Sequence, residues 1–151
     1  MPDLYRTLRP VLFSLDPEQA HNLTLKIMKT GLMPKCPAVS HPALEVELWG
    51  LKFPNPVGLS AGFDKNAEVI APALDMGFGF VEAGTVTPKP QHGNPKPRVF
   101  RDPSNDAVIN RMGFPSQGSE FVQMQLNPLL KVGWFERNFG IQKKKKKRKK
   151  M

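Results

Sequence analysis

The residue types best suited to chemistry are concentrated in one stretch, residues 55–66. An apolar, strand-like run at 57–59 breaks into the small residues 60–62 and then reaches the charged pair Asp64 and Lys65. Small residues at the end of a strand let a flat ligand approach the backbone, because no branched side chain stands in its way. A lysine at that edge can place a fixed cation against an anionic substrate or a reduced cofactor ring. The stretch therefore predicts a ligand site at a strand end.

A second strand is predicted at 78–83, ending in Gly84 and Thr85. Between the two strands, residues 67–76 predict a helix that Gly77 ends. The order strand–helix–strand, with polar residues at the strand ends, favours a parallel α/β architecture. The glycines of this region do not form a dinucleotide-binding fingerprint, because their spacing is wrong and prolines rather than a helix follow them.

A third group of polar residues follows a long loop. Residues 88–105 contain five prolines and predict a structureless loop, and a loop of this length is usually functional. The apolar pair 108–109 then leads into residues 110–114, a segment that contains the amide side chain of Asn110 and the glycine Gly113. A helix is predicted over 117–130 and a third strand over 134–141.

Two short amphipathic helices are predicted ahead of these elements. The first covers residues 4–14, with apolar side chains at helical spacing. Asp16 and Gln19 can form a capping box that starts the second helix, which runs to about Thr30. Two interpretations of the pair remain open: a cap packed on the core, or a surface pair that rests on a membrane and admits an apolar ligand.

A linker and a small hairpin are predicted between the helical pair and the core strands. Residues 32–43 contain three prolines and read as the linker. Short strands are predicted at 44–48 and 51–53, joined by Trp49 and Gly50. This hairpin is expected to close the floor of the domain.

Length and composition limit the class of protein. The 151 residues suffice for one domain but fall short of the roughly 250 of a complete (β/α)₈ barrel. No apolar run approaches the roughly 20 residues of a membrane span, and the N-terminus lacks the pattern of a secretory signal. A single cysteine, Cys36, excludes an internal disulfide framework and fits a reducing cytoplasm.

The net charge of +9 comes from one end of the sequence. Residues 143–150 are eight consecutive cations, and of the 22 basic residues the remaining 14 nearly balance 13 acidic ones. The body is therefore close to neutral, so no nucleic-acid partner is expected. Two hypotheses for the tail remain open: a frameshift or gene-end error in an A-rich stretch, or a solvated basic arm that binds nucleic acid or anionic lipid.

Taken in order, several segments resemble dihydroorotate dehydrogenases. The resemblance covers roughly residues 3–118 and is carried by co-linear motifs at 55–65, 77–88, 93–101 and 108–114. The segment from Asp16 to His21 resembles the membrane-associated, quinone-reducing class of that family, class 2. Each motif alone is weak evidence, whereas their shared order is highly specific.

This resemblance implies an FMN enzyme on a (β/α)₈ TIM barrel that oxidises dihydroorotate to orotate in pyrimidine biosynthesis. Electrons would pass from the reduced flavin to a quinone that enters between the N-terminal helices. The implied location is the cytoplasmic side of the cell inner membrane, with peripheral contact through those helices. The resemblance implies no metal site.

The resemblance also implies an organisation for the chain. Residues 1–31 would form a helical segment for the quinone tunnel and the membrane contact, and residues 32–43 a linker. Residues 44–142 would form part of a TIM barrel, with about its first three strands. Residues 143–151 would be a lysine-rich tail outside the family pattern.

By motif position, the resemblance assigns three sets of site residues. The flavin would be lined by Ala61, Gly62, Phe63, Asp64, Lys65 and Thr85. The substrate would be bound by Lys65, Asn110, Arg111, Met112, Gly113 and Phe114. The quinone tunnel would be lined by His21 and Arg101.

The chemistry of the implied substrate agrees with these residue types. Dihydroorotate carries a carboxylate and ring amides, so it needs a cation and a group that both donates and accepts, which Lys65 and Asn110 supply. Hydride transfer leaves negative charge on the flavin, which a nearby ammonium stabilises. The plainer alternatives are a solvated surface lysine for Lys65, a turn-forming amide for Asn110 and a helix-surface histidine for His21.

The sequence departs from the family pattern after about residue 118. Pro115 and Ser116 stand where an asparagine pair is common, and Gln142 stands where the third strand would bring an asparagine to the flavin. The family's catalytic serine base and its glycine-rich turns for the FMN phosphate are expected to lie beyond this chain's end. We therefore expect this polypeptide alone to be a truncated, inactive version of the enzyme.

Overall fold

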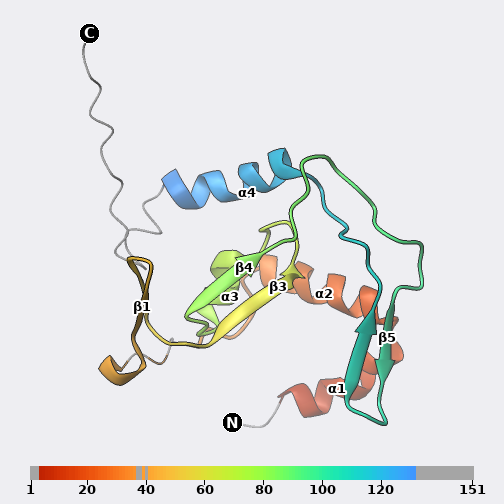
Figure 1. Ribbon diagram of the computed structural model, residues 1–151. Helices are drawn as coiled ribbons and strands as arrows, with labels where there is room; N and C mark the ends of the chain where they lie inside the picture. The colour runs from red at the N-terminus through yellow and green to blue at the C-terminus, as the bar shows by residue number, and fades with distance from the viewer. Residues whose placement is uncertain (1–3, 37–38, 40, 132–151) are drawn as a thin grey trace.

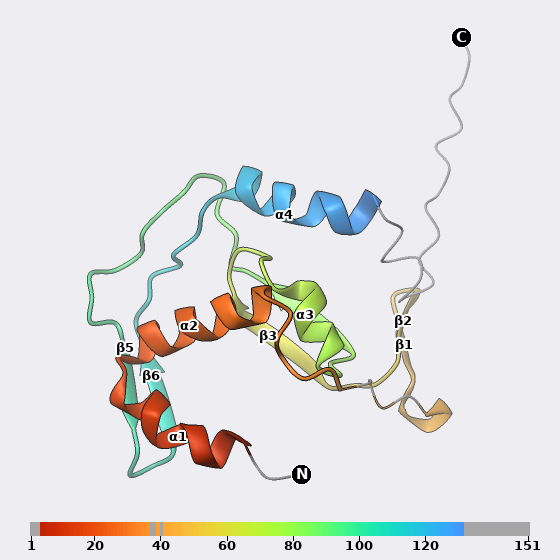
Figure 2. The same ribbon diagram turned by 180° about the vertical axis from the view of Figure 1, so that it is seen from behind.

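The computed structural model describes residues 4–36, 39 and 41–131. The central unit consists of strand β3 (Gly58–Asp64), helix α3 (Ile70–Asp75) and strand β4 (Phe80–Ala83) (Figure 1). Around it lie three longer helices, α1 (Leu4–Ser14), α2 (Pro17–Lys29) and α4 (Ser119–Lys131). Two antiparallel hairpins lie on opposite sides of it, β1 (Val46–Leu48) with β2 (Leu51–Phe53), and β5 (Val99–Asp102) with β6 (Ala107–Asn110) (Figure 2).

The unit β3–α3–β4 confirms the predicted parallel strand–helix–strand order. Its two strands are hydrogen-bonded in parallel, from Gly58 opposite Phe80 to Asp64 opposite Ala83. β3 continues past its predicted end at residue 59, so the small residues that follow belong to the strand itself. The described residues contain these two parallel strands and no closed barrel, and the third strand predicted at 134–141 lies outside them.

Asp64 explains why α3 is shorter than the predicted 67–76. Its side chain is fully buried, and its carboxylate oxygens accept hydrogen bonds from the backbone N–H groups of Glu68 (2.9 Å) and Val69 (2.8 Å). These bonds hold residues 65–69 in a turn, so the helix begins only at Ile70. The first residue of that turn is Lys65.

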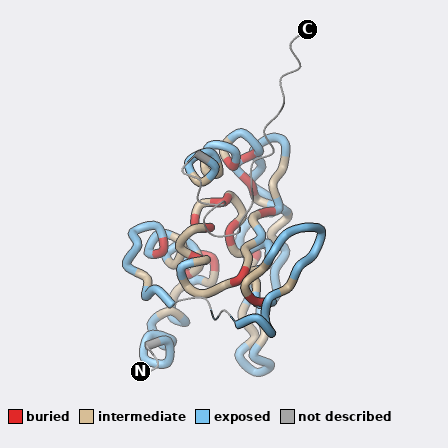
Figure 3. The backbone as a smooth tube through the Cα atoms, turned by 90° about the vertical axis from the view of Figure 1, so that its left-hand side faces the viewer, coloured by how far each residue is buried: buried red, intermediate tan, exposed pale blue. Residues whose placement is uncertain are grey.

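The core forms where α3 packs between α2 and α4. Met28 of α2 is buried with Val69 and Ala73 in one cluster. Ile70 is buried with Val122 of α4 in another. Buried residues follow these contacts, whereas the outer faces of the helices and hairpins are exposed (Figure 3). Two helices from distant parts of the sequence therefore fix α3, and with it the end of β3.

The β5–β6 hairpin corrects the prediction of a structureless loop over residues 88–105. Its strands pair in an antiparallel ladder that ends with Asn110 opposite Val99. Asp102 shapes the turn, because its carboxylate accepts a hydrogen bond from the Ser104 N–H at 3.2 Å. The loop therefore ends at residue 98, and Asn110 is fixed as the last residue of a strand.

The other predicted elements are confirmed with shifted ends. β1 begins at Val46 rather than at residue 44, because Pro42–Leu44 form a short 3₁₀ helix. The hairpin turn lies at Trp49 and Gly50, as the sequence predicts. The helix predicted over 117–130 covers 119–131, and the strand predicted over 78–83 begins at residue 80.

The predicted N-terminal helices are both present. The carboxylate of Asp16 accepts hydrogen bonds from the N–H groups of Glu18 and Gln19, both at 3.0 Å, and so caps the start of α2. Pro17 occupies the first position of the helix. The cap fixes the register of α2 and thereby the face on which Glu18 lies.

A buried ion pair joins α2 to the segment that precedes β5. Arg98 donates to both carboxylate oxygens of Glu18, from Nη2 at 2.6 Å and from Nε at 3.1 Å. The two side chains are only 9% and 10% exposed. Arg98 also donates to the carbonyls of His92 and Asn94, so one guanidinium holds both the helix and the loop. This contact is termed the Glu18–Arg98 clasp.

Replacing Asp64 by alanine is expected to lower the free energy of unfolding by about 2–4 kcal/mol, because two backbone N–H groups lose their acceptors in the interior. Urea denaturation followed by circular dichroism measures the change. Glu47→Ala is the control, because its side chain is 63% exposed and its carboxylate lies 4.0 Å from Lys52, and its effect is expected within about 1 kcal/mol. Equal losses in the two variants would contradict the role given to Asp64.

The clasp predicts a pH dependence of stability. The hydrogen bond from Arg98 lowers the pKa of Glu18 below its ordinary value of 4.5, against the opposing effect of burial. Because the folded pKa is the lower one, the stabilisation is present above pH 4.5 and is lost as the pH falls through the folded value. Glu18→Gln is expected to remove this acid-side loss.

The same substitution at Glu47 is the control for the clasp. Its carboxylate lies 4.0 Å from Lys52, and both side chains are well exposed, so Glu47→Gln should leave the stability curve unchanged. Denaturation midpoints between pH 3 and pH 7 make the comparison. A Glu18→Gln curve that still falls as steeply as the wild type below pH 4.5 would refute the assignment.

Candidate ligand-binding site

Lys65 lies where three cavities meet. Together with Met112, it lines cavities of about 560, 580 and 410 Å³. The side chain is half-buried, and its ammonium donates a hydrogen bond to the carbonyl of Gly62. Burial lowers the pKa of Lys65 below its ordinary value of 10.5. The alternative of a fully solvated surface lysine does not fit this position.

The smallest of the three cavities collects most of the predicted cofactor and substrate residues. This strand-end cavity, of about 410 Å³, is lined by Ala61, Gly62, Lys65, Thr85, Asn110, Arg111, Met112, Gly113 and Phe114. Three further residues, Gly84, Asn94 and Pro115, complete the lining. Residues predicted from three separate motifs therefore meet around one space.

The backbone of the strand-end cavity leaves room for a flat ligand. Gly62 has a φ of +103° and no heavy atom within 4 Å of the position that a Cβ would take. Its N–H donates to the carbonyl of Gly84 at 2.8 Å, and the Gly84 N–H donates to the carbonyl of Asp64 at 2.9 Å. These bonds fix the two strand ends against each other. A planar group can approach Gly62 without meeting a side chain, as the sequence predicts.

Asn110 lines a cavity, as expected of a ligand-binding residue, and its amide also helps to form a turn, the plainer alternative considered for it. It ends β6 and lines the strand-end cavity. Its side-chain oxygen also accepts a long hydrogen bond, 3.4 Å, from the N–H of Met112, so the amide helps to form the turn that follows. Next to it, Arg111 donates to the carbonyl of Pro97 at 3.1 Å.

The predicted flavin segment 61–65 divides between different faces of the structure. Phe63 lines the two larger cavities rather than the strand-end cavity, and Asp64 is not among the residues that line any of the three. Successive side chains of a strand point to opposite sides, which explains the division. The carboxylate of Asp64 serves the turn before α3, and a direct contact of Asp64 or Phe63 with flavin stays a prediction.

A helix–hairpin cavity of about 580 Å³ brings together the two residues predicted for the quinone tunnel. His21 and Arg101 line it with five apolar side chains, Pro17, Phe63, Val99, Val108 and Met112. Gly62, Lys65 and Asn110 line both this cavity and the strand-end cavity. The two spaces are therefore adjacent.

His21 is held in a partly apolar setting. Its ring contacts the ring of Phe63 edge to face, with 5.1 Å between the centroids. Burial, followed by the positive charge of Lys65, lowers the pKa of His21 below its ordinary value of 6.5. Neutral imidazole is therefore the form favoured at neutral pH. This half-buried position does not fit an ordinary helix-surface histidine.

Arg101 has a structural role that the sequence analysis missed. Its guanidinium donates to the carbonyls of Leu12 (3.2 Å), Phe13 (3.3 Å) and Leu15 (2.8 Å) at the C-terminal end of α1. It also lies 4.6 Å from the centroid of the Phe13 ring. A cation at this end of a helix satisfies free carbonyls and complements the helix dipole. Arg101 therefore caps α1 while lining the helix–hairpin cavity.

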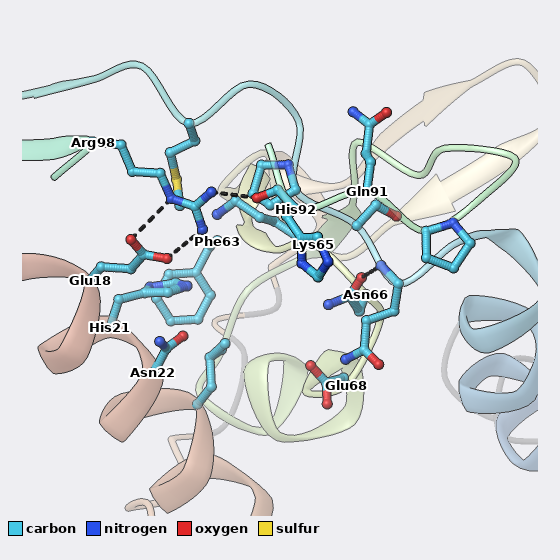
Figure 4. A pocket seen from close by; sticks show the side chains of 16 residues that line it. Glu18, His21, Asn22, Phe63, Lys65, Asn66, Glu68, Gln91, His92 and Arg98 are labelled. Atoms are coloured by element: carbon cyan, nitrogen blue, oxygen red, sulfur yellow. Dashed lines mark hydrogen bonds and ion pairs between the residues drawn. The ribbon is translucent and has the colours of Figure 1, made fainter. Parts of the chain in front are cut away.

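The largest side-chain network lies in the α2 cavity, of about 560 Å³, between α2 and the loop after β4 (Figure 4). Glu18 and His21 reach into it from α2, and Arg98 points toward Glu18 from the opposite wall. The sequence analysis did not single out Glu18 or Arg98, although both lie within recognised motifs. Their partnership spans 80 residues, and no local pattern signals it.

In residues 4–36, 39 and 41–131, the possible metal ligands are dispersed and the helices are short. No group of three or more His, Cys, Asp or Glu side chains in those ranges is arranged to hold a metal ion. None of the helices described is both long enough and apolar enough to cross a bilayer. Cys36 is exposed, and its N–H donates to the carbonyl of Asp75 at 2.9 Å.

Comparison with known sequences identifies relatives of this chain. A family model described as dihydroorotate dehydrogenase matches residues 43–150. The curated dihydroorotate dehydrogenase (quinone) of Azorhizobium caulinodans is 57% identical over 116 residues, which cover 77% of this chain and 33% of that protein. The one from Rhizobium etli is 49% identical over 138 residues, which cover 91% and 38%. The chain thus spans about a third of the length of the curated relatives that it matches.

Solved structures agree with the sequence comparison. The ligand-free dihydroorotate dehydrogenase of Eimeria tenella superposes with a TM-score of 0.75 at 48% identity, over 82% of this chain and 34% of that one. The same enzyme in complex with ferulenol gives a TM-score of 0.75 at 46% identity, over 84% and 35%. With a family match over more than half of its residues, this chain belongs to the dihydroorotate dehydrogenase family.

Proposed function

We propose that this chain carries part of the active site of a quinone-dependent dihydroorotate dehydrogenase. The reaction would oxidise dihydroorotate to orotate with FMN and deliver the electrons to a quinone, in pyrimidine biosynthesis. The observation that carries the proposal is the strand-end cavity, in which residues of the motifs at 55–65, 77–88 and 108–114 line one space around Lys65. The names of the quinone-dependent relatives support the acceptor. In this proposal β3 and β4 are the first two strands of the family's TIM barrel.

The residues of the strand-end cavity fit the ring portion of FMN. When bound, FMN would supply the hydride acceptor. Ala61 and Gly62 would lie under the ring, because the space above Gly62 is open, and Thr85 would line its edge. The ammonium of Lys65 would stabilise negative charge at that edge from a half-buried position, where it is screened less than in water.

Substrate recognition would fall to the other wall of the same cavity. Lys65 would pair with the carboxylate of dihydroorotate, and the Asn110 amide would donate to and accept from its ring. The remaining wall is the segment 111–114. The serine base expected beyond this chain's end, and the inactivity expected of this polypeptide alone, stay predictions.

The helix–hairpin cavity suits a quinone. Val99, Val108 and Phe63 offer it an apolar lining, and His21 and Arg101 are among the polar groups of the lining that could hydrogen-bond its oxygens. The lowered pKa of His21 favours a neutral imidazole there, which avoids burying a second charge beside Lys65. Because this cavity adjoins the strand-end cavity, the quinone that accepts the electrons would lie close to the flavin that supplies them.

We also propose a peripheral membrane contact, on the cytoplasmic side of the inner membrane, through α1 and α2. Both helices expose large apolar side chains, namely Tyr5 (56%), Leu8 (44%), Val11 (62%), Leu23 (41%) and Ile27 (40%). Amphipathic helices of this kind bind the interface between headgroups and acyl chains. The alternative activity, electrostatic binding through residues 143–150, concerns residues outside the described ranges, and no observation within those ranges favours it.

Replacing Lys65 by alanine is expected to weaken orotate binding on the order of tenfold to a hundredfold, because a charge-assisted hydrogen bond to the carboxylate is lost. Isothermal titration of orotate into the full chain in the presence of FMN measures the dissociation constant. Lys89→Ala, which removes an exposed lysine, should bind like the wild type. If the wild type bound neither FMN nor orotate, the proposed function would fail. If Lys65→Ala kept full affinity, the role of Lys65 would fail.

Replacing Val11 by glutamate is expected to reduce binding to vesicles of mixed neutral and anionic lipid severalfold, because a charge would enter the apolar interface. Val57→Glu is the matched control, since Val57 is 61% exposed, Val11 is 62% exposed, and Val57 lies away from the helices. Co-sedimentation of the two variants makes the comparison. Equal vesicle binding by the two variants would argue against membrane docking through α1.

A further inference from the structure

The wall of the strand-end cavity formed by residues 110–114, termed the cavity loop, is held by one side chain at its start. The amide nitrogen Nδ2 of Asn94 donates to the carbonyl of Arg111 at 2.7 Å. The backbone N–H of the same residue donates to the carbonyl of Met112 at 2.9 Å. Asn94 therefore orients two successive carbonyls of the loop.

A second amide side chain holds the end of the cavity loop. Nε2 of Gln91 donates to the carbonyls of Gly113 (3.3 Å) and Phe114 (2.8 Å). The position of Gln91 is itself fixed, because its backbone N–H and carbonyl pair with those of Ser116, both at 2.9 Å. Four successive carbonyls, those of residues 111–114, thus accept hydrogen bonds from residues 91 and 94.

The contact between the two segments is close. A Cβ on Gly113 would lie 2.8 Å from Cγ of Asn94, and one on Gly93 would lie 2.2 Å from the carbonyl oxygen of Met112. Gly113 and Phe114 both adopt positive φ, at 70° and 54°. Positive φ is unfavourable for a phenylalanine, and it persists only where its surroundings impose it. The hydrogen bond from Gln91 to the Phe114 carbonyl is such a constraint.

The orientation of the carbonyls decides the polarity of the loop. In a trans peptide unit the N–H points opposite to the carbonyl. The N–H groups of Gly113 and Phe114 therefore point away from residues 91–94, toward which the carbonyls of Met112 and Gly113 are turned. Acceptor oxygens left free beside an anion would repel it, whereas here they are occupied. The arrangement favours a ligand that carries negative charge.

We propose that Gln91 and Asn94 are positioning residues for the substrate site. Their side-chain amides hold three carbonyls of the cavity loop, and the backbone N–H of Asn94 holds a fourth, that of Met112. Together these bonds set the shape of the loop and its preference for an anion. This inference rests on the proposed function for the identity of the anion, dihydroorotate or its product orotate. It adds two residues that do not belong to the sets assigned from the sequence. Gln91 lies outside the strand-end cavity and acts through the loop, whereas Asn94 holds the loop and also lines the cavity.

The test removes each amide without changing its size or adding charge. Gln91→Met and Asn94→Leu are expected to weaken orotate binding to the full chain in the presence of FMN by about tenfold or more, measured by isothermal titration. Gln91→Asn keeps an amide with a shorter reach and should fall between Gln91→Met and the wild type. Gln117→Met is the matched control, because that glutamine is exposed and bonds through its backbone N–H to Asn66.

Two readouts separate positioning from a general loss of structure. Uracil lacks the carboxylate of orotate, so the variants should lose less affinity for uracil than for orotate, whereas partial unfolding would reduce both alike. In the ligand-free chain, amide hydrogen exchange at Asn94 and Ser116, whose N–H groups donate to the carbonyls of Met112 and Gln91 across this contact, should be at least severalfold faster in Gln91→Met. Exchange at Ala73, in the core, should be unchanged.

The outcomes distinguish this inference from the proposed function. Wild-type affinity for orotate in both folded variants would overturn the inference and leave the proposed function standing. A wild type that binds no orotate would overturn the proposed function and the anion preference together. Unchanged exchange at Asn94 and Ser116 in Gln91→Met would overturn the positioning role whether or not any ligand binds.

Discussion

Two hydrogen bonds to one buried carboxylate determine where the chemistry of this chain can occur. Asp64 ends β3 and holds the backbone of the next few residues in a turn, so Lys65 departs from the strand at a fixed point. The helix that follows is itself held between α2 and α4 by apolar contacts. The location of one cation, and of the cavities around it, therefore depends on packing contributed by both ends of the described chain.

Arginines attach both N-terminal helices, in addition to the apolar contacts that α2 makes with α3. Arg98 binds Glu18 of α2, and Arg101 binds the last carbonyls of α1, so one short segment around β5 holds both helices. Several large apolar side chains of both helices, such as Val11 of α1 and Leu23 of α2, nevertheless stay exposed. The same segment supplies a wall of the helix–hairpin cavity. Attachment of the helices and formation of the cavity are thus consequences of the same few residues.

Local patterns predicted most of the elements and most of the residues that line the strand-end cavity. Capping at Asp16 and the strand–helix–strand order depend on neighbouring residues, and the motifs around Lys65 and Asn110 brought their residues to one cavity. What escaped prediction depends on distant partners. The β5 strand exists because β6 pairs with it, in a stretch whose prolines suggested a loop. The Glu18–Arg98 clasp spans 80 residues. The full burial of Asp64 was not predicted either, because burial is decided only by the tertiary fold.

The position of Arg101 has a thermodynamic consequence. Because its guanidinium secures the end of α1 and also borders the helix–hairpin cavity, occupancy of that cavity and docking of the helix are coupled. Coupling of this kind is reciprocal: an occupant that draws the guanidinium away loosens the helix by the same factor by which a loosened helix alters the occupant's affinity. The stability with which α1 docks would then depend on whether the helix–hairpin cavity is filled.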